Sequence, residues 1–162
     1  MPTARRSRTI AAPVEELWAL VSDPHHLPRW WPRVTRVENV EDDAFTEVMR
    51  TRKGKAVRAD FNVVHNDQPT HALTWAQRVE GTPFARVLRS SETILRLVPR
   101  AVADGLPSGD NEALTAGGAT EVTIELRQAL VGVFPRLGGF MVRRAAAATL
   151  DEALDGLERI YG

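Results

Sequence analysis

Several polar side chains stand on segments that are otherwise typical of β-strands, and such groups could transfer protons if they faced a pocket. The set comprises Asp60, Gln77, Ser90, Ser91, Glu92 and Gln128. General acid–base catalysis needs one or two such groups within hydrogen-bond reach of a substrate, for example to move a proton from an enolisable carbon. A register shift of one residue would put Ser90 and Glu92 in place of Ser91 and Thr93, so the inward face of this strand stays open. The sequence therefore assigns no catalytic residue.

Metal ligation and covalent catalysis find little support in the sequence. His25 and His26 are adjacent and point in different directions, and His65 and His71 flank a turn without an obvious third ligand. The chain has no Cys, which excludes disulfides, thiolate nucleophiles and Cys-ligated metals. It also lacks a G-x-S-x-G motif, a Gly-rich phosphate loop and a dinucleotide fingerprint. We therefore expect no metal and no cofactor.

The charge balance argues against nucleic acid as a partner. Among 162 residues, 21 are acidic and 21 are Lys or Arg, so the formal net charge is zero. A general nucleic-acid binder usually needs a basic excess to neutralise phosphates. No stretch approaches the roughly 20 apolar residues that span a bilayer, and no apolar segment follows the basic N-terminus as in a signal peptide. We expect a cytoplasmic protein with no membrane span.

Hydrophobic patterning predicts seven strands, near residues 4–11, 33–40, 44–52, 57–63, 73–79, 84–98 and 122–127. The clearest alternation of apolar and polar residues covers 57–63 and is typical of a half-buried strand. Two short helices are expected after the first strand, one from Val14 to Val21 and one from about His25 to Trp31. Most of the connections between strands are short turns, which favours an antiparallel sheet.

A final helix of about 23 residues is expected after Pro135 and Gly138-Gly139, because apolar residues recur there at helical spacing. At 1.5 Å per residue it would be roughly 34 Å long, enough to cross a small domain. The run from Ala145 to Ala148 makes its middle thin. A bent sheet with such a helix across its mouth leaves apolar space that side chains do not fill. Unfilled space is unfavourable unless a ligand occupies it.

The first 32 residues carry a pattern of Ala12-Pro13, a helix with Leu17-Trp18, Asp23, Leu27-Pro28 and Trp30-Trp31-Pro32. This pattern resembles the opening of the SRPBCC superfamily, which includes START lipid-transfer domains, the birch-pollen allergen class and polyketide cyclase/dehydrase proteins. The segments 120–123 and 141–144 are similar to the last strand and the last helix of that group. The resemblance implies a single α+β domain over residues 1–162. Its helix-grip fold has a seven-stranded curved antiparallel sheet wrapped around a long C-terminal helix, with two short helices after the first strand. Residues 100–118 depart from the pattern and are expected to form a flexible loop.

Two aromatic residues and one Arg leave alternatives open. Trp30 and Trp31 either fill the junction between helix and sheet, which we favour, or wall the ligand entrance. Arg144 either is solvated, which we favour, or points into the cavity, where a ligand carboxylate or carbonyl would pair with it.

The implied cavity lies between the sheet and the C-terminal helix. Its expected lining is Phe61, Val63, Trp75, Leu95, Leu97, Val122, Ile124, Leu126, Phe140, Met141, Arg144 and Ala148. The leading hypothesis is that the protein binds or carries a small hydrophobic molecule such as a lipid, polyketide or isoprenoid. A polyketide cyclase, aromatase or dehydratase acting by acid–base chemistry is one alternative, and a protein-interaction module with a vestigial cavity is another. Homodimers are common among soluble proteins, and the sequence shows no interface signal.

Overall fold

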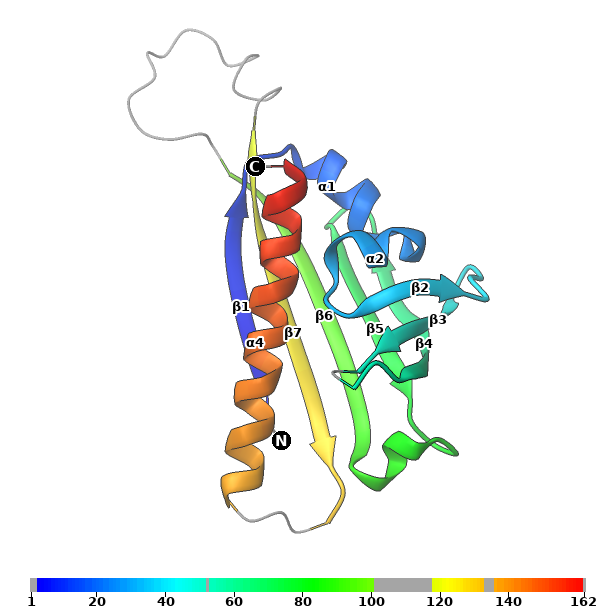
Figure 1. Ribbon diagram of the computed structural model, residues 1–162. Coiled ribbons are helices and arrows are strands. Elements are labelled where there is room, and N and C mark those ends of the chain that lie inside the picture. The colour runs from blue at the N-terminus through cyan, green and yellow to red at the C-terminus, as the bar shows by residue number, and fades with distance from the viewer. Residues whose placement is uncertain (1–2, 52, 101–117, 133–135, 162) are drawn as a thin grey trace, which may run out of the picture.

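The computed structural model describes residues 3–51, 53–100, 118–132 and 136–161 (Figure 1). The expected loop at 100–118 therefore falls, apart from its two end residues, outside the described residues. The elements in chain order are β1 Thr3–Ile10, α1 Val14–Val21, the 3-10 turn η1 Pro24–His26, α2 Leu27–Trp30, β2 Val34–Glu38, β3 Ala44–Arg50, β4 Ala56–Asp67, β5 Ala72–Arg78, the 3-10 turn η2 Pro83–Arg86, β6 Leu88–Arg100, β7 Ala119–Leu130 and α4 Arg136–Tyr161.

The seven strands form one sheet in the order β1-β7-β6-β5-β4-β3-β2, and each neighbouring pair is antiparallel. Figure 1 shows α4 lying along β1 and β7, with α1 and α2 beside its C-terminal end on the same side of the sheet. The prediction of a seven-stranded antiparallel sheet, two short helices and a long C-terminal helix is confirmed. The segment from His25 to Trp31 is divided between η1 and α2, because Pro24 and Pro28 each stand in the first turn of a separate helical segment.

The main core lies where α1 and the C-terminal half of α4 meet the sheet. Strand pairing aligns Leu73 with Leu95 and Leu95 with Ile124, which gives one apolar row across β5, β6 and β7. Leu150 and Leu154 of α4 are fully buried in the same cluster. A fully buried leucine removes enough apolar surface from water to contribute about 1.5–3 kcal/mol, so this end of the molecule stabilises the fold.

Two boundaries differ from the sequence-based expectation. The last helix begins at Arg136, so Gly138 and Gly139 lie inside it rather than before it. A glycine within a helix costs only about 1 kcal/mol relative to alanine, which tertiary packing of a long helix readily outweighs. Residues 83–86 form η2 instead of the start of a strand, because Pro83 has no N–H for a sheet ladder and suits a first helical turn.

Candidate functional site: a pocket between the sheet and helix α4

A pocket of about 310 Å³ lies between the inner face of the sheet and the N-terminal half of α4. Its lining combines β3 to β7, the Trp31–Arg33 segment and one face of α4. The lining residues are Trp31, Pro32, Arg33, Glu47, Met49, Phe61, Trp75, Gln77, Ser91, Thr93, Leu126, Gln128, Val142, Ala145, Ala146 and Thr149. Its volume lies near the lower end of the roughly 300–1,000 Å³ typical of small-molecule sites.

Two other hollows have larger volumes, about 360 and 590 Å³, and lie beside the C-terminal half of α4. Both are bordered by the exposed charged residues Asp155 and Arg159. The pocket beneath α4 is the better candidate, because its walls come from buried side chains on the concave face of the sheet.

Polar side chains form a cross-strand row on the inner face of three adjacent strands, β5, β6 and β7. Ser91 of β6 pairs directly with Gln128 of β7, and Thr93, two residues along, pairs with both Trp75 and Leu126. Gln77 of β5 lies opposite Phe61 of β4. Ser91 and Thr93 are buried, and the side-chain Nε2 of Gln77 is buried without a hydrogen-bond partner among the described residues. Buried polar atoms are normally satisfied, so an unpaired donor in a pocket wall is available to a ligand or a bound water.

Glu47 is the most unusual residue of the lining. It stands on the inner face of β3 between Phe45 and Met49, and only 2% of it is exposed. Burial raises the pKa of its carboxyl group from 4.5 to about 8. In the described part of the chain this carboxyl group forms no ion pair and no hydrogen bond. Near neutral pH the group is mostly a neutral carboxylic acid, which can donate as well as accept a hydrogen bond.

Aromatic rings form the apolar walls. Trp31 and Trp75 meet edge to face, with ring centroids 6.0 Å apart, and Phe45 stacks on Phe61 with centroids 5.3 Å apart. Trp30 is buried in the core, whereas Trp31 is half-buried and lines the pocket. Trp30 thus fills the junction between helix and sheet, which is the role that we favoured for both residues. Trp31 instead forms part of the pocket wall. Flat aromatic surfaces suit a ligand that contains rings.

The mouth of the pocket is bordered by Arg33 and α4. The Arg33 guanidinium donates a hydrogen bond to the Thr149 hydroxyl at 3.1 Å and lies 3.9 Å from the Glu152 carboxylate. Residue 33 has a left-handed backbone conformation with φ of 65°, and its carbonyl accepts a hydrogen bond from the Arg50 amide. Arg33 therefore connects the start of β2 to the helix across the opening.

The structure brings only part of the expected lining to the pocket. Phe61, Trp75 and Leu126 line it, while Leu95, Leu97, Val122 and Ile124 are buried in the packed core at the other end of the sheet. Val63 is half-buried and packs against the core. These side chains do face inward, but α1 and the leucines of α4 fill the space in front of the core residues.

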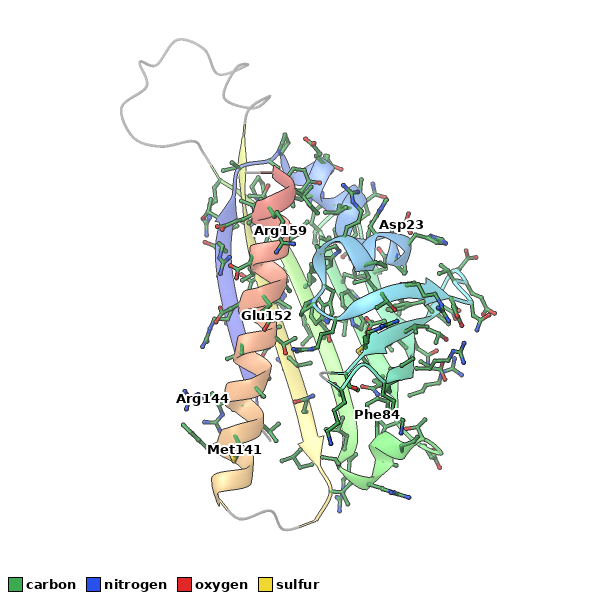
Figure 2. All side chains as sticks on the ribbon, viewed as in Figure 1. Asp23, Phe84, Met141, Arg144, Glu152 and Arg159 are labelled. Carbon is green, nitrogen blue, oxygen red and sulfur yellow. The ribbon has the colours of Figure 1, made fainter. Side chains whose placement is uncertain are left out.

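The face of α4 that lines this pocket differs from the expected one. Phe140 and Met141 are 57% and 67% exposed, and Arg144 and Ala148 are also exposed. Figure 2 shows Arg144 extending outward from α4, on the side away from β3 to β5. The helix presents Val142, Ala145, Ala146 and Thr149 instead. Successive residues of a helix are rotated by about 100° around its axis. Apolar residues occur on all sides of the N-terminal half of α4, so the sequence did not determine which face would meet the sheet.

The structure also settles which polar residues on the strands face inward. Gln77, Ser91 and Gln128 line the pocket, whereas Ser90 is exposed and Asp60 accepts a hydrogen bond from Thr46 outside the lining. Glu92 is half-buried and outside the lining. Glu47 was missed. Phe45, Glu47 and Met49 alternate along β3, so they share one face of the strand, and two of the three are apolar. Thr46 and Val48 share the other face, which looks equally suited to burial, so the sequence did not show which face points inward.

No group of three or more His, Cys, Asp or Glu side chains in the described ranges is arranged to hold a metal ion. Over the same ranges, no helix combines the length and the apolar composition needed to cross a membrane.

The model of the family described as polyketide cyclase/dehydrase and lipid transport matches residues 1–162. No curated protein is significantly similar in sequence to this chain. Among solved structures, a START superfamily protein from Mycobacterium smegmatis has a TM-score of 0.69 at 16% identity, covering 98% of this chain and 96% of that one. A protein from Thermobifida fusca reaches 0.70 at 19% identity, with 100% and 94% covered. The di-domain ARO/CYC BexL from the BE-7585A biosynthetic pathway reaches 0.72 at 20% identity, covering 98% of this chain and 46% of BexL. At these identities the structural likeness establishes the fold.

Proposed function

This chain belongs to the polyketide cyclase/dehydrase and lipid transport family, and we propose that it binds one compact, ring-containing small molecule in the pocket beneath α4. One observation carries the proposal. The pocket combines the aromatic walls Trp31 and Trp75 with two buried polar groups, Glu47 and Gln77. The Gln77 Nε2 has no hydrogen-bond partner among the described residues, and burial alone accounts for the raised pKa of Glu47. Apolar surface of the ligand would supply affinity at about 25 cal/mol per Å², and the polar groups would fix its orientation.

The pocket volume favours a compact molecule over a long-chain lipid. About 310 Å³ is small for a ligand site, and the packed leucine core closes the pocket at its far end. The small side chains of Ala145 and Ala146 create the space that exists. Within the classes expected from the sequence, an aromatic or polycyclic polyketide or a short isoprenoid fits this volume better than an acyl chain.

Acid–base catalysis on such a molecule is a second candidate, and Glu47 is the observation that favours it. A carboxylic acid with a pKa of about 8 inside a pocket is suited to exchange a proton with a bound substrate near neutral pH. Incubation with a poly-β-ketone mimic tests this candidate, since a binder leaves the mimic unchanged and an enzyme of this kind converts it to a cyclised or dehydrated product.

Native mass spectrometry of freshly purified protein tests the binding function, and a filled pocket is its sharpest control. Ala146→Phe should place a ring in the pocket and remove the co-purifying small molecule, while circular dichroism shows that the fold persists. The matched variant is Ala148→Phe, because Ala148 is exposed on the same helix outside the pocket. It should retain the ligand. Retention by Ala146→Phe, or loss by both variants, would place the ligand elsewhere.

A further inference from the structure

Glu47 places a hydrogen-bonding carboxyl group in the wall of the pocket. Glu47 pairs with Ala59 of β4 on one side and with Val37 of β2 on the other. Ala59 carries only a methyl group, so the residue paired with Glu47 on the neighbouring strand offers its carboxyl group no hydrogen-bond partner. Gln77 stands on β5, two strands away, and lies opposite Phe61 rather than Ala59, so it is also offset by two residues along the sheet. The two backbone positions are therefore roughly 12 Å apart. Both side chains line the same space.

Both groups offer a hydrogen to a ligand. The Nε2 of Gln77 is a buried donor without a partner among the described residues, and the protonated Glu47 carboxyl group has one O–H. A carbonyl oxygen has two lone pairs and can accept from one or both of these donors. Leaving such donors unpaired in a buried site is unfavourable, so a ligand that lacks an acceptor gains less from entering.

We propose that Glu47 and Gln77 make this pocket selective for ring-containing molecules with an uncharged carbonyl oxygen, and that they discriminate against the corresponding carboxylates. This inference rests on the proposed function, because it assigns the ligand class of the same pocket.

Charge in the pocket explains the discrimination against anions. Apart from Glu47, the only ionisable residue of the lining among the described residues is Arg33. Its guanidinium is at the mouth, bonded to Thr149 and close to Glu152, rather than beside Glu47. Within the part of the chain that the structure describes, no cation therefore stands next to Glu47 to pair with a ligand carboxylate. A buried carboxylate without a cation carries a large desolvation penalty.

Three naphthalene probes of nearly equal shape test the proposal by titration of the intrinsic tryptophan fluorescence. Acetylnaphthalene carries a ketone, ethylnaphthalene is its apolar counterpart, and naphthoate carries a carboxylate. At pH 6.5 we expect the ketone to bind about ten-fold more tightly than the apolar probe, and naphthoate to bind most weakly. Glu47→Leu and Gln77→Leu should each reduce the ratio of the acetylnaphthalene affinity to the ethylnaphthalene affinity, because each variant removes a donor that only the ketone satisfies. Arg100→Leu, on the exposed end of β6, is the control and should preserve all three affinities.

The outcomes separate this inference from the proposed function. Equal binding of acetylnaphthalene and ethylnaphthalene, or an advantage of the ketone that survives both pocket variants, overturns the ligand class and leaves the binding function intact. Tighter binding of naphthoate also overturns it. If no probe binds and native mass spectrometry finds no ligand, the proposed function itself fails.

A pH titration with the same probes gives an independent readout. As the pH rises above about 8, Glu47 loses its proton and can no longer donate a hydrogen bond, so the ratio of the acetylnaphthalene affinity to the ethylnaphthalene affinity should fall. In Gln77→Leu the same fall should persist, and in Glu47→Leu it should disappear. A fall that persists in Glu47→Leu contradicts the role of this carboxyl group.

Discussion

The two ends of the space beneath α4 differ in what fills them, although the same sheet and the same helix form both. At the closed end, Leu95 and Ile124 of the sheet meet Leu150 and Leu154 of the helix, and all four are almost completely buried. At the open end, the sheet carries Glu47, Gln77, Ser91 and Gln128, and the helix carries Ala145, Ala146 and Thr149. The closed end holds the fold together, and the open end leaves room for a ligand.

The difference lies in side-chain size on the helix and polarity on the sheet. Leucines on α4 reach the apolar row of the sheet and exclude water, whereas alanines leave a gap. Large-to-small changes in a packed core are therefore expected to cost stability, and changes at the pocket are expected to alter binding. The following predictions test this contrast, from the largest expected effect to the smallest.

Leu150→Ala should lower the free energy of unfolding by about 2–5 kcal/mol, because Leu150 is fully buried and its removal leaves a cavity. Urea denaturation measures the loss. Val142→Ala is the matched change at the open end and should cost less than about 1 kcal/mol, since Val142 is half-buried and borders existing space. Similar losses for both variants would contradict the distinction between the two ends.

Gly156→Ala should destabilise the closed end by about 1–3 kcal/mol, although alanine is the better helix former. A Cβ at this position would lie 2.9 Å from the backbone Cα of Trp30 and 3.0 Å from its carbonyl carbon, and the carbonyl oxygen is nearer still. Backbone atoms of α2 cannot move aside as a flexible side chain can. Thermal denaturation checks the sign.

Ala148→Gly is the reverse substitution at an exposed position of α4 and serves as the control for Gly156→Ala. It should lower the free energy of unfolding by only about 1 kcal/mol, through the lower helix propensity of glycine. A stabilised Gly156→Ala would show that the contact between α2 and α4 is looser than described.

The stability of the protein should fall as the pH rises through the range in which Glu47 is protonated only in the folded state. The folded pKa is about 8 and the unfolded value is 4.5. Between these values the native protein retains a proton that the unfolded chain has released, so this group lowers the free energy of unfolding by about 1.4 kcal/mol per pH unit. Above about pH 8 its effect levels off.

Urea denaturation at pH 5.5, 6.5 and 7.5 measures this slope against Glu47→Gln, which should lack the contribution of this group. Glu80→Gln, an exposed position, should keep the wild-type slope. Equal slopes for wild type and Glu47→Gln would mean that Glu47 is ionised in the folded protein.

Sequence patterns predicted the fold well and the pocket only in part. Alternation in β4 and the helical spacing of α1 and α4 are local properties, so they identified the elements and their order. The inward faces of β5 and β7 were also predictable, and Trp75 and Leu126 reached the pocket as expected. Glu47 was not predicted, because a carboxylate within a strand looks like a solvent-facing residue until tertiary packing covers it.

The amino-acid sequence by itself determined the seven strands, the long last helix and the small side chains in its middle, because these depend on periodicity and propensity along the chain. Only the tertiary structure decided that Val142, Ala145, Ala146 and Thr149 line the pocket while Arg144 and Ala148 lie outside it. It also decided which inward residues are covered by leucines and which remain accessible. Helix rotation and the depth of packing arise from contacts between segments far apart in sequence, and no local pattern encodes them.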